Sequence, residues 1–296
     1  NKKSSFAIFA LIAVLIGGTL LLKDGPKKNQ MGSVYENSGK IVAYHIESPS
    51  NLRYEIRVND FLLAQNTPST GNLIQYIHPG ENTVSIRINE NISANTPTNF
   101  KITINERIPE NDGQYITYKA QPGVPDLVSY TWDSAKDKLP VIVEKKFQTI
   151  MGMPMFLSDK GETLSITPQN KKEVLVEATL IHKAFSEKDI ETIHEKMTPI
   201  YMETEQMFND PEINLELILD EITKSVQGGE LKLKPVSNKI DDYIYTLYGN
   251  GKIIHIKNKS GVAFLESLKA EEGSDNASAW FELFFSKIDG KWVWVR

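Results

Sequence analysis

The chain has no cysteine among its 296 residues. This absence excludes disulfide bonds, thiolate nucleophiles, iron–sulfur clusters, cysteine-ligated zinc and attachment through a lipid-modified cysteine. The sequence also lacks glycine-rich phosphate loops, dinucleotide fingerprints and nucleophile-elbow serines, which mark large classes of enzymes. We therefore expect no cofactor and no metal, and we do not expect an enzyme.

Positive charge is scarce over most of the chain. Residues 1–40 contain six bases and two acids, a net charge of +4, whereas residues 41–296 contain 27 bases and 36 acids, a net charge of −9. Phosphate binding needs clustered Lys and Arg, so nucleic acid is not an expected partner. Residues 161–296 alone hold 16 bases and 23 acids, a net charge of −7. An acidic surface of this kind favours a protein partner with a basic surface.

Only one apolar run is long enough to cross a membrane. It covers residues 6–22, about 25 Å of helix, and follows a short basic N-terminus at residues 1–5. We expect an uncleaved transmembrane signal anchor that contacts the lipid bilayer, followed by a tether over residues 23–40. The alternatives are a cleaved signal peptide, for which the residues after Thr19 make a poor cleavage site, and a buried core helix. The anchor predicts a bacterial inner-membrane protein with its C-terminal part in the periplasm.

Residues 41–150 have the pattern of an antiparallel β-sandwich. Short alternating segments are separated by turn residues, with a hairpin turn expected at Asn59-Asp60. The strand-like segments are IVAYHIES, LRYEIRVNDFLLAQ, NLIQYI, NTVSIRIN, FKITINERI, QYITYKA, LVSYTW and PVIVEKKF. The stretch RVNDFLLAQ…YIHPGENTVSIRI resembles a layout common in immunoglobulin-like and galactose-binding-like sandwiches. That resemblance covers about 30 residues and implies no ligand residues.

Residues 151–170 are rich in Met, Gly and Pro and are expected to link two domains. Residues 171–296 then predict an α+β domain. Val174, Ala178, Ile181 and Phe185 recur on one helix face, and Ser186 is expected to cap a second helix with Asp189 three residues on. Six strand segments follow: LKLKPV, DYIYTLY, KIIHIK, VAFLESLK, AWFELFFSK and KWVWVR.

Two stretches of this region, AFSEKDIETI and WFELFFSKIDGKWVWVR, resemble the nuclear-transport-factor-like (cystatin-like) superfamily. The resemblance covers residues 171–296 and implies helices packed on one face of a curved antiparallel sheet. Enzymes of that superfamily place an acid–base pair in the mouth of the cone. By this resemblance His182, Asp189 and Tyr201 are candidates for a cone pocket, although Asp189 is more simply explained as a helix cap and Tyr201 as a wall residue.

Histidines and aromatic residues are the other candidates for function. His194-Glu195 begins like a zinc-metalloprotease helix but lacks the second histidine, while His45 and His78 are expected to be structural. The aromatic residues of the last strands either form a core or form an exposed patch that binds a partner. The candidates for partner binding are Tyr243, Tyr245, Trp280, Trp292 and Trp294.

These features favour recognition over catalysis. We expect a membrane-anchored envelope protein that binds a protein partner, for example an immunity protein that neutralises a secreted bacterial toxin. The alternatives are a scaffold or assembly subunit of an envelope complex, and a small-ligand binder or enzyme that uses the cone pocket.

Overall fold

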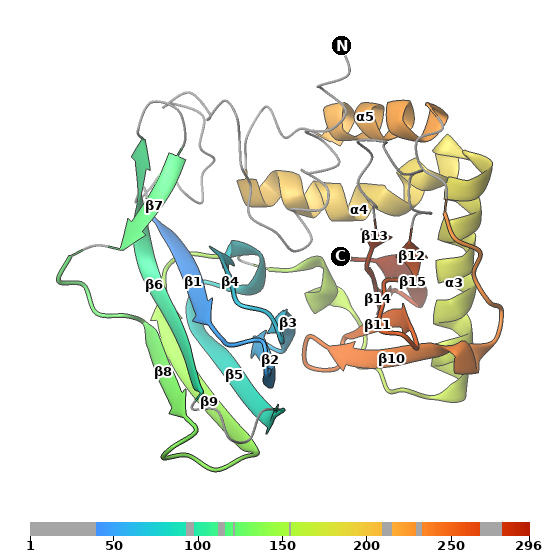
Figure 1. The fold of residues 1–296 in the computed structure, drawn as a ribbon. Helices are drawn as coiled ribbons and strands as arrows, with labels where there is room; N and C mark the ends of the chain where they lie inside the picture. Colours follow the sequence, from blue (N-terminus) through green and yellow to red (C-terminus); the bar gives the residue numbers. More distant parts are fainter. Residues whose placement is uncertain are drawn as a thin grey trace, which may run out of the picture. The chain divides into compact units, whose positions relative to one another are not determined.

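The computed structural model describes residues 40–92, 98–111, 116–120, 122–153, 155–208, 215–228, 233–266 and 280–296. They form two compact units, and the division falls between Met155 and Phe156 (Figure 1). The predicted anchor at residues 6–22 lies outside the described residues, as do residues 1–5 and the tether up to residue 39. Of the helices that the structure describes, none has both the length and the apolar character needed to cross a membrane.

The described residues of the first unit form two antiparallel sheets. Its strands are β1 (Ile41–Glu47), β2 (Leu52–Val58), β3 (Phe61–Gln65), β4 (Ser69–Asn72), β5 (Gly80–Asn91), β6 (Asn99–Asn111), β7 (Ile116–Ala120), β8 (Val128–Asp133) and β9 (Val141–Thr149). One sheet has the order β4-β1-β6-β7, with β8 also paired to β6. The other has the order β3-β2-β5-β9.

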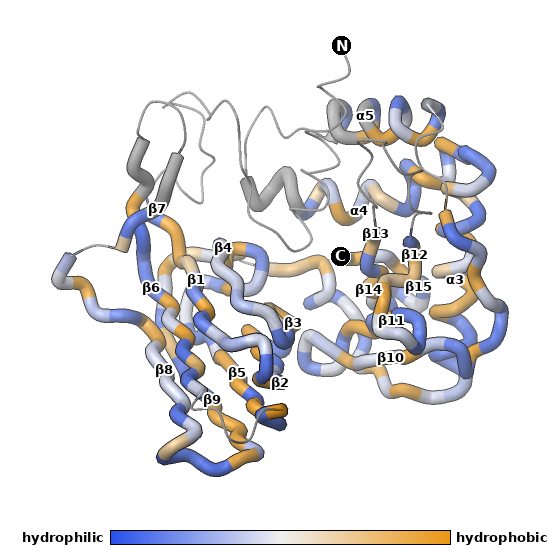
Figure 2. The backbone as a smooth tube through the Cα atoms, in the orientation of Figure 1, coloured by the Kyte–Doolittle hydropathy of each residue, from blue (hydrophilic) through white to orange (hydrophobic). Residues whose placement is uncertain are grey.

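Alternating apolar residues build the interior of the first unit. In β5, Val84, Ile86 and Ile88 are fully buried, whereas Arg87 between them is exposed. Figure 2 shows the alternation of apolar and polar residues along this strand. The rings of Tyr54 in one sheet and Phe100 in the other lie 5.0 Å apart. The apolar faces of the two sheets therefore pack against each other.

A buried asparagine joins two turns of the first unit. Asn82 is 1% exposed, and its Oδ1 accepts hydrogen bonds from Asn59 Nδ2 at 2.7 Å and from the His78 amide at 2.9 Å. Its Nδ2 donates to the carbonyls of His78 and Gly80. All four hydrogen-bonding positions of the side chain are thus satisfied. Asn59 and Asp60 have φ values of 48° and 64°, as a two-residue hairpin turn requires, so the predicted hairpin is confirmed.

One predicted strand of this unit is wrong. The segment NLIQYI was expected to be extended, but Ile74–Tyr76 form a short 3₁₀ helix, η1, directly after β4. The Asn72 side chain explains the difference, because its Oδ1 accepts a hydrogen bond from the Ile74 amide at 2.8 Å. Such an Asx turn bends the backbone out of the ladder.

The described part of the second unit contains three α-helices, a main antiparallel sheet and a two-stranded sheet. Its elements are η2 (Leu157–Lys160), α3 (Pro168–Glu187), α4 (Ile190–Phe208), α5 (Leu215–Gln227), η3 (Ile240–Asp242), β10 (Tyr243–Tyr248), β11 (Ile253–Asn258), β12 (Leu265–Glu266), β13 (Trp280–Phe281), β14 (Leu283–Ile288) and β15 (Lys291–Trp294). The main sheet has the order β10-β11-β14-β15, and β12 pairs with β13. Together with the first unit, this makes an α+β protein of mainly antiparallel sheets, as predicted.

Helix α3 supplies the predicted apolar face. Val174, Ala178, Ile181 and Phe185 are all at most 3% exposed, and they pack in one core with sheet residues such as Ile254. The helix begins where Thr167 Oγ1 accepts a hydrogen bond from the Asn170 amide, with proline at the first helical position. This core fixes the helices on one face of the sheet.

The predicted cap of the second helix is displaced by three residues. Ser186 lies in the last turn of α3, where its Oγ donates to the His182 carbonyl at 2.8 Å. Lys188, with φ of 59°, ends α3 in the left-handed conformation. Asp189 is the cap of α4, because its Oδ1 accepts a hydrogen bond from the Thr192 amide and its Oδ2 one from the Thr192 hydroxyl.

Residues 156–164 form a strap across the main sheet of the second unit. The Glu162 amide donates to the Lys287 carbonyl at 2.8 Å, and the Leu164 amide donates to the Gly251 carbonyl at 2.7 Å. Gly161 approaches so closely that a Cβ on it would lie 2.0 Å from Ser286 Oγ. Much of the predicted 151–170 linker is therefore packed structure.

Candidate functional site

The second unit places a histidine inside its main sheet. His255 lies in β11 within the sequence Ile253-Ile254-His255-Ile256, and all four residues are buried. Its side chain is 3% exposed, and Nε2 lies 2.6 Å from Glu282 Oε2. Because a carboxylate only accepts hydrogen bonds, we assign the Nε2 proton to the imidazole and the acceptor role to Glu282.

A change of sheet positions Glu282 for this contact. β13 pairs with β12, whereas β14 pairs with β11, so the chain passes from one sheet to the other at Glu282. His255 is directly opposite Phe284 in the ladder. Glu282 precedes Phe284 by two residues and is therefore a diagonal neighbour on the same sheet face. This break also corrects the prediction of one continuous strand over AWFELFFSK.

Aromatic rings surround the imidazole. The Phe284 ring stacks on it at 4.2 Å between centroids with an interplanar angle of 14°, and the Tyr248 ring lies 5.9 Å away. His255 Nδ1 is buried and has no hydrogen-bond partner among the described residues. An unsatisfied buried polar atom costs about 1–3 kcal/mol, so this nitrogen calls for an explanation.

The pair has a definite chemical capability. When the carboxylate accepts a hydrogen bond from Nε2–H, the imidazole is neutral and its Nδ1 carries a lone pair that can accept a hydrogen bond. A metal site needs further ligands, and no group of three His, Asp or Glu side chains suited to a metal occurs in the described part of the chain. We therefore treat His255 and Glu282 as a candidate acceptor site for a hydrogen-bond donor.

The three residues predicted for a cone pocket have separate structural roles. His182 Nε2 lies 2.8 Å from the Lys234 carbonyl. Asp189 is exposed and caps α4. Tyr201 is 3% exposed in the helix–sheet core, and burial raises its pKa. No hydrogen bond joins any two of these side chains.

The aromatic residues predicted to bind a partner belong mainly to the core. Tyr243 is 9% exposed and Trp294 is 2% exposed, and both pack in the helix–sheet core. Trp292 and Tyr245 are partly buried against the same core. The backbone of Trp280 forms part of β13, but its side chain is not among the parts that the structure describes. An exposed aromatic surface is therefore the wrong interpretation for Tyr243 and Trp294, whose burial fits the alternative of a tight core.

Trp292 is held by helix α3. Its Nε1 donates to Glu173 Oε2 at 2.7 Å, and Lys287 Nζ lies 3.2 Å from the same oxygen. Hydrogen bonds from Gln169, Trp292 and Lys287 lower the pKa of Glu173 to about 2. This cluster ties β14 and β15 to α3.

Two other histidines have described side-chain contacts. His194 Nε2 lies 2.8 Å from Thr223 Oγ1 and 3.1 Å from the Leu219 carbonyl oxygen, so it connects α4 with α5. His45 is exposed beside Glu47. The position of His255 between isoleucines in KIIHIK indicated in the sequence that this histidine could be buried. No pattern in the sequence indicated that Glu282 would be its partner.

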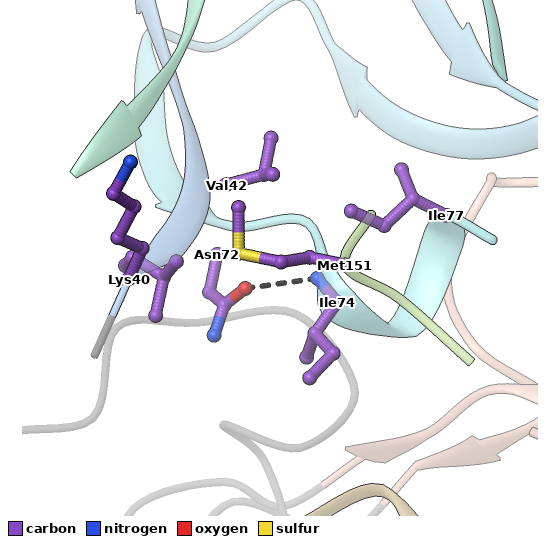
Figure 3. Close-up of a pocket in the computed structure, with 7 residues that line it drawn as sticks. Lys40, Val42, Asn72, Ile74, Ile77 and Met151 are labelled. Carbon is purple, nitrogen blue, oxygen red and sulfur yellow. Dashed lines mark hydrogen bonds between the residues drawn. The ribbon is translucent and has the colours of Figure 1, made fainter. Parts of the chain in front are cut away.

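A small hollow lies in the first unit (Figure 3). It has room for about one water molecule. Figure 3 shows the Met151 side chain beside Asn72, whose Oδ1 is bonded to the Ile74 amide. The lining residues are Lys40, Ile41, Val42, Asn72, Ile74, Ile77 and Met151. The hollow is too small for an organic ligand.

Comparison of the chain with protein family models, with curated proteins and with solved structures finds no match.

Proposed function

We propose that this chain is an envelope protein that recognises a basic protein partner through its second unit. Residues 6–22 would hold it in a bacterial inner membrane, with both units in the periplasm. The charge distribution carries the proposal, because residues 161–296 have a net charge of −7 and residues 41–160, with 11 bases and 13 acids, only −2. Such a field steers a basic partner toward one unit.

Exposed carboxylates in the second unit support this reading. Glu191 on α4, Glu216 on α5 and Asp241 in η3 are exposed. None of the three forms an ion pair with another residue that the structure describes. Their charges are therefore not neutralised by those neighbours and remain available to a partner.

An immunity-type role is the specific form of the proposal. A membrane-held acidic protein meets an incoming basic toxin after it enters the periplasm. We also propose a more specific fold for each unit. The two facing sheets of the first unit are consistent with an immunoglobulin-like sandwich. The helices on one face of the main sheet of the second unit are consistent with a cystatin-like cone. Neither fold implies a reaction.

The test is cross-linking in intact cells, followed by binding measurements with the partner it identifies. The expected partner is basic, and its affinity falls with salt. A charge-neutralised variant carries Glu191→Gln, Glu216→Gln and Asp241→Asn. Its association rate should fall at least tenfold at low salt. A control with the same change in net charge neutralises three exposed acids of the first unit: Glu47→Gln, Glu90→Gln and Glu144→Gln. Equal effects of the two variants would contradict recognition by the second unit.

The scaffold alternative makes a different prediction in the same experiment. Several envelope subunits would cross-link to the first unit, and neutralising the acids of the second unit would leave their binding unchanged. A basic partner found on the second unit alone would exclude this alternative.

The pairing of buried His255 with partly exposed Glu282 favours one further candidate function, a small-ligand binder or enzyme in the second unit. Its test is a thermal-shift screen of sterol-like, glycan and peptide ligands, because a ligand that binds only the folded state raises Tm. Stabilisation in the wild type should disappear in the His255→Asn variant. A ligand that stabilises both proteins equally would exclude His255 as its site.

A further inference from the structure

Strand β9 forms an edge of the sheet β3-β2-β5-β9, and β5 is the strand with which it pairs. The Asn59 amide donates to the Thr83 carbonyl at 2.8 Å, and the Thr83 amide donates to Asn59 Oδ1 at 3.0 Å. Thr83 in β5 therefore points its backbone groups away from β9. Because this direction alternates along a strand, β5 bonds β9 through its even-numbered residues, which lie opposite the odd-numbered residues of β9. The backbone groups of the even-numbered residues of β9 then point outward.

The outward positions of β9 are open in the described part of the chain. They are Ile142, Glu144, Lys146 and Gln148. No other described residue forms a backbone hydrogen bond along this edge. All four side chains are exposed, that of Ile142 by 67%. An open edge on a strand of nine residues is a template for pairing with a further strand.

Charges in the middle of β9 decide which strand can pair with it. Glu144, Lys145 and Lys146 follow one another there, and such charges keep an edge from pairing with most strands. Cross-strand pairs of opposite charge stabilise a sheet, whereas like charges directly opposite each other destabilise it. A strand that fits must therefore carry opposite charges where it faces Glu144 and Lys146.

A second copy of β9 meets this requirement in one antiparallel register. When a two-fold axis normal to the sheet passes through Lys145, Glu144 of each copy lies opposite Lys146 of the other. Ile142 then lies opposite Gln148, so all four outward residues of each copy are paired. Each of these four pairs exchanges two backbone hydrogen bonds, which gives eight bonds between the two edges.

Neighbouring registers are less favourable. Moving the axis to Glu144 or to Lys146 places two like charges directly opposite each other and leaves three of the four hydrogen-bonded pairs. The register through Lys145 also places the partly buried Val143 opposite Phe147 on the inner face. The apolar layer of the sandwich would thus continue from one copy to the other.

We propose that the outward edge of β9 is the interface of a two-fold dimer of this chain, in which two four-stranded sheets join into one antiparallel sheet of eight strands. The open edge and its self-complementary charges select a second copy as the occupant. The two Lys145 side chains oppose the dimer, because they lie opposite each other at the axis. Lys145 is exposed, so its charged end stays in water and the repulsion lowers the affinity without abolishing it.

The first test uses the absence of cysteine from the chain. In the full chain in detergent micelles, Lys145→Cys places two thiols opposite each other in a non-hydrogen-bonded pair. The Cα atoms of such a pair lie about 4.5 Å apart, which is within the range of a disulfide. Oxidation with copper phenanthroline should convert most of this variant into a covalent dimer on a non-reducing gel. Glu144→Cys is the matched control, since its two copies are offset along the strands, and it should cross-link at least tenfold less.

The second test reverses the charges and measures association by sedimentation equilibrium of the full chain in detergent. Glu144→Lys and Lys146→Glu should each weaken the wild-type dimer at least tenfold, because each variant places like charges opposite each other twice. An equimolar mixture of the two variants should regain the wild-type affinity, because every new charge then faces its opposite in the other chain. This recovery would also show that both variants fold. Glu47→Lys makes the same change of charge in the other sheet and should leave association unchanged.

Four results would overturn the proposal. The first is a wild-type chain that remains a monomer at every concentration up to its solubility limit. The second is cross-linking of Glu144→Cys in preference to Lys145→Cys, which would show a different register. The third is a mixture of the two charge variants that does not regain the dimer. The fourth is equal weakening of the dimer by Glu47→Lys.

Discussion

Replacing Gly161 by alanine tests whether the strap is packed as tightly as the structure shows. The new Cβ would lie 2.0 Å from Ser286 Oγ and 2.9 Å from the Ser158 carbonyl oxygen. Ser286 is fully buried, and its Oγ donates to the Lys252 carbonyl at 2.8 Å. Gly161 itself has φ of −72°, a value open to any residue. The effect of the substitution therefore comes from the contact and not from backbone strain.

The size of the effect follows from two contributions. Overpacking a filled site costs about 1–3 kcal/mol. Displacing the serine hydroxyl from its carbonyl acceptor costs about 1–3 kcal/mol more, because the buried groups lose their hydrogen bond. We expect Gly161→Ala to lower the free energy of unfolding of the second unit by about 3 kcal/mol.

A double-mutant cycle isolates the contact. Ser286→Ala alone should cost about 1 kcal/mol, since it removes one hydrogen bond. In the double variant, Ser286→Ala removes the Oγ atom that lies closest to the new Cβ at position 161. The free energy of unfolding of the double variant should therefore exceed, by at least about 1.5 kcal/mol, the value expected if the two single losses simply added. Urea unfolding, followed by hydrogen exchange of second-unit peptides, measures all three variants.

Gly261→Ala provides the contrasting control. Gly261 has φ of +82° with open space around its Cβ position, so alanine there costs about 1 kcal/mol through backbone strain alone. Ser286→Ala should not alter that cost. Strictly additive effects of Gly161→Ala and Ser286→Ala would refute the packing of the strap on Ser286.

Three further predictions concern other parts of the molecule. Asn82→Ala removes four hydrogen bonds from a buried site and should destabilise the first unit by about 3 kcal/mol in urea unfolding; a loss below about 1 kcal/mol would contradict the role of this residue. The pKa of Glu173 is lowered to about 2, so its stabilising contribution is complete above pH 4.5 and is lost as pH falls toward 2. When Tm is measured as a function of pH, the wild type should lose stability between pH 4.5 and pH 2 through Glu173, and Glu173→Gln should lack this loss. Identical curves of Tm against pH for the two proteins would exclude a contribution from Glu173. Ile150 is 81% exposed, so Ile150→Ser should change stability by less than about 0.5 kcal/mol; a larger loss in a thermal melt would show that this side chain is covered.

The secondary structure was predictable in elements such as β5 and α3, where one face of a long, regular element is buried. The alternation through Val84, Ile86 and Ile88 predicted β5, and the spacing of Val174 and Ala178 predicted the core face of α3. These patterns record burial, because most buried positions of a half-buried strand or helix are apolar.

Predictions failed where a polar side chain bonds its own backbone. Asn72 turns the chain after β4, and Asp189 rather than Ser186 caps α4. A serine or an asparagine has several backbone partners within reach, and only the folded chain selects one. Trp294 is a different case, since an aromatic residue in a terminal strand fits a core and a docking surface equally well.

The candidate site was least accessible to prediction from sequence. His255 and Glu282 are 27 residues apart, and they meet because the chain changes sheets at Glu282. The role of Glu203 was likewise hidden, since its carboxylate accepts a hydrogen bond from a backbone amide 46 positions earlier. Contacts of this kind depend on strand order and register, which local patterns do not encode.

We propose that residues 6–22 hold both folded units outside the cytoplasm. Alkaline carbonate extraction of cell membranes, followed by protease treatment of spheroplasts, tests it directly. We predict that the full-length chain stays with the membrane and that the external protease degrades residues 40–296. The proposal would be contradicted if the intact chain were recovered in the soluble cytosolic fraction and were not cleaved by the protease. That result would also contradict the proposed binding of a basic partner in the periplasm.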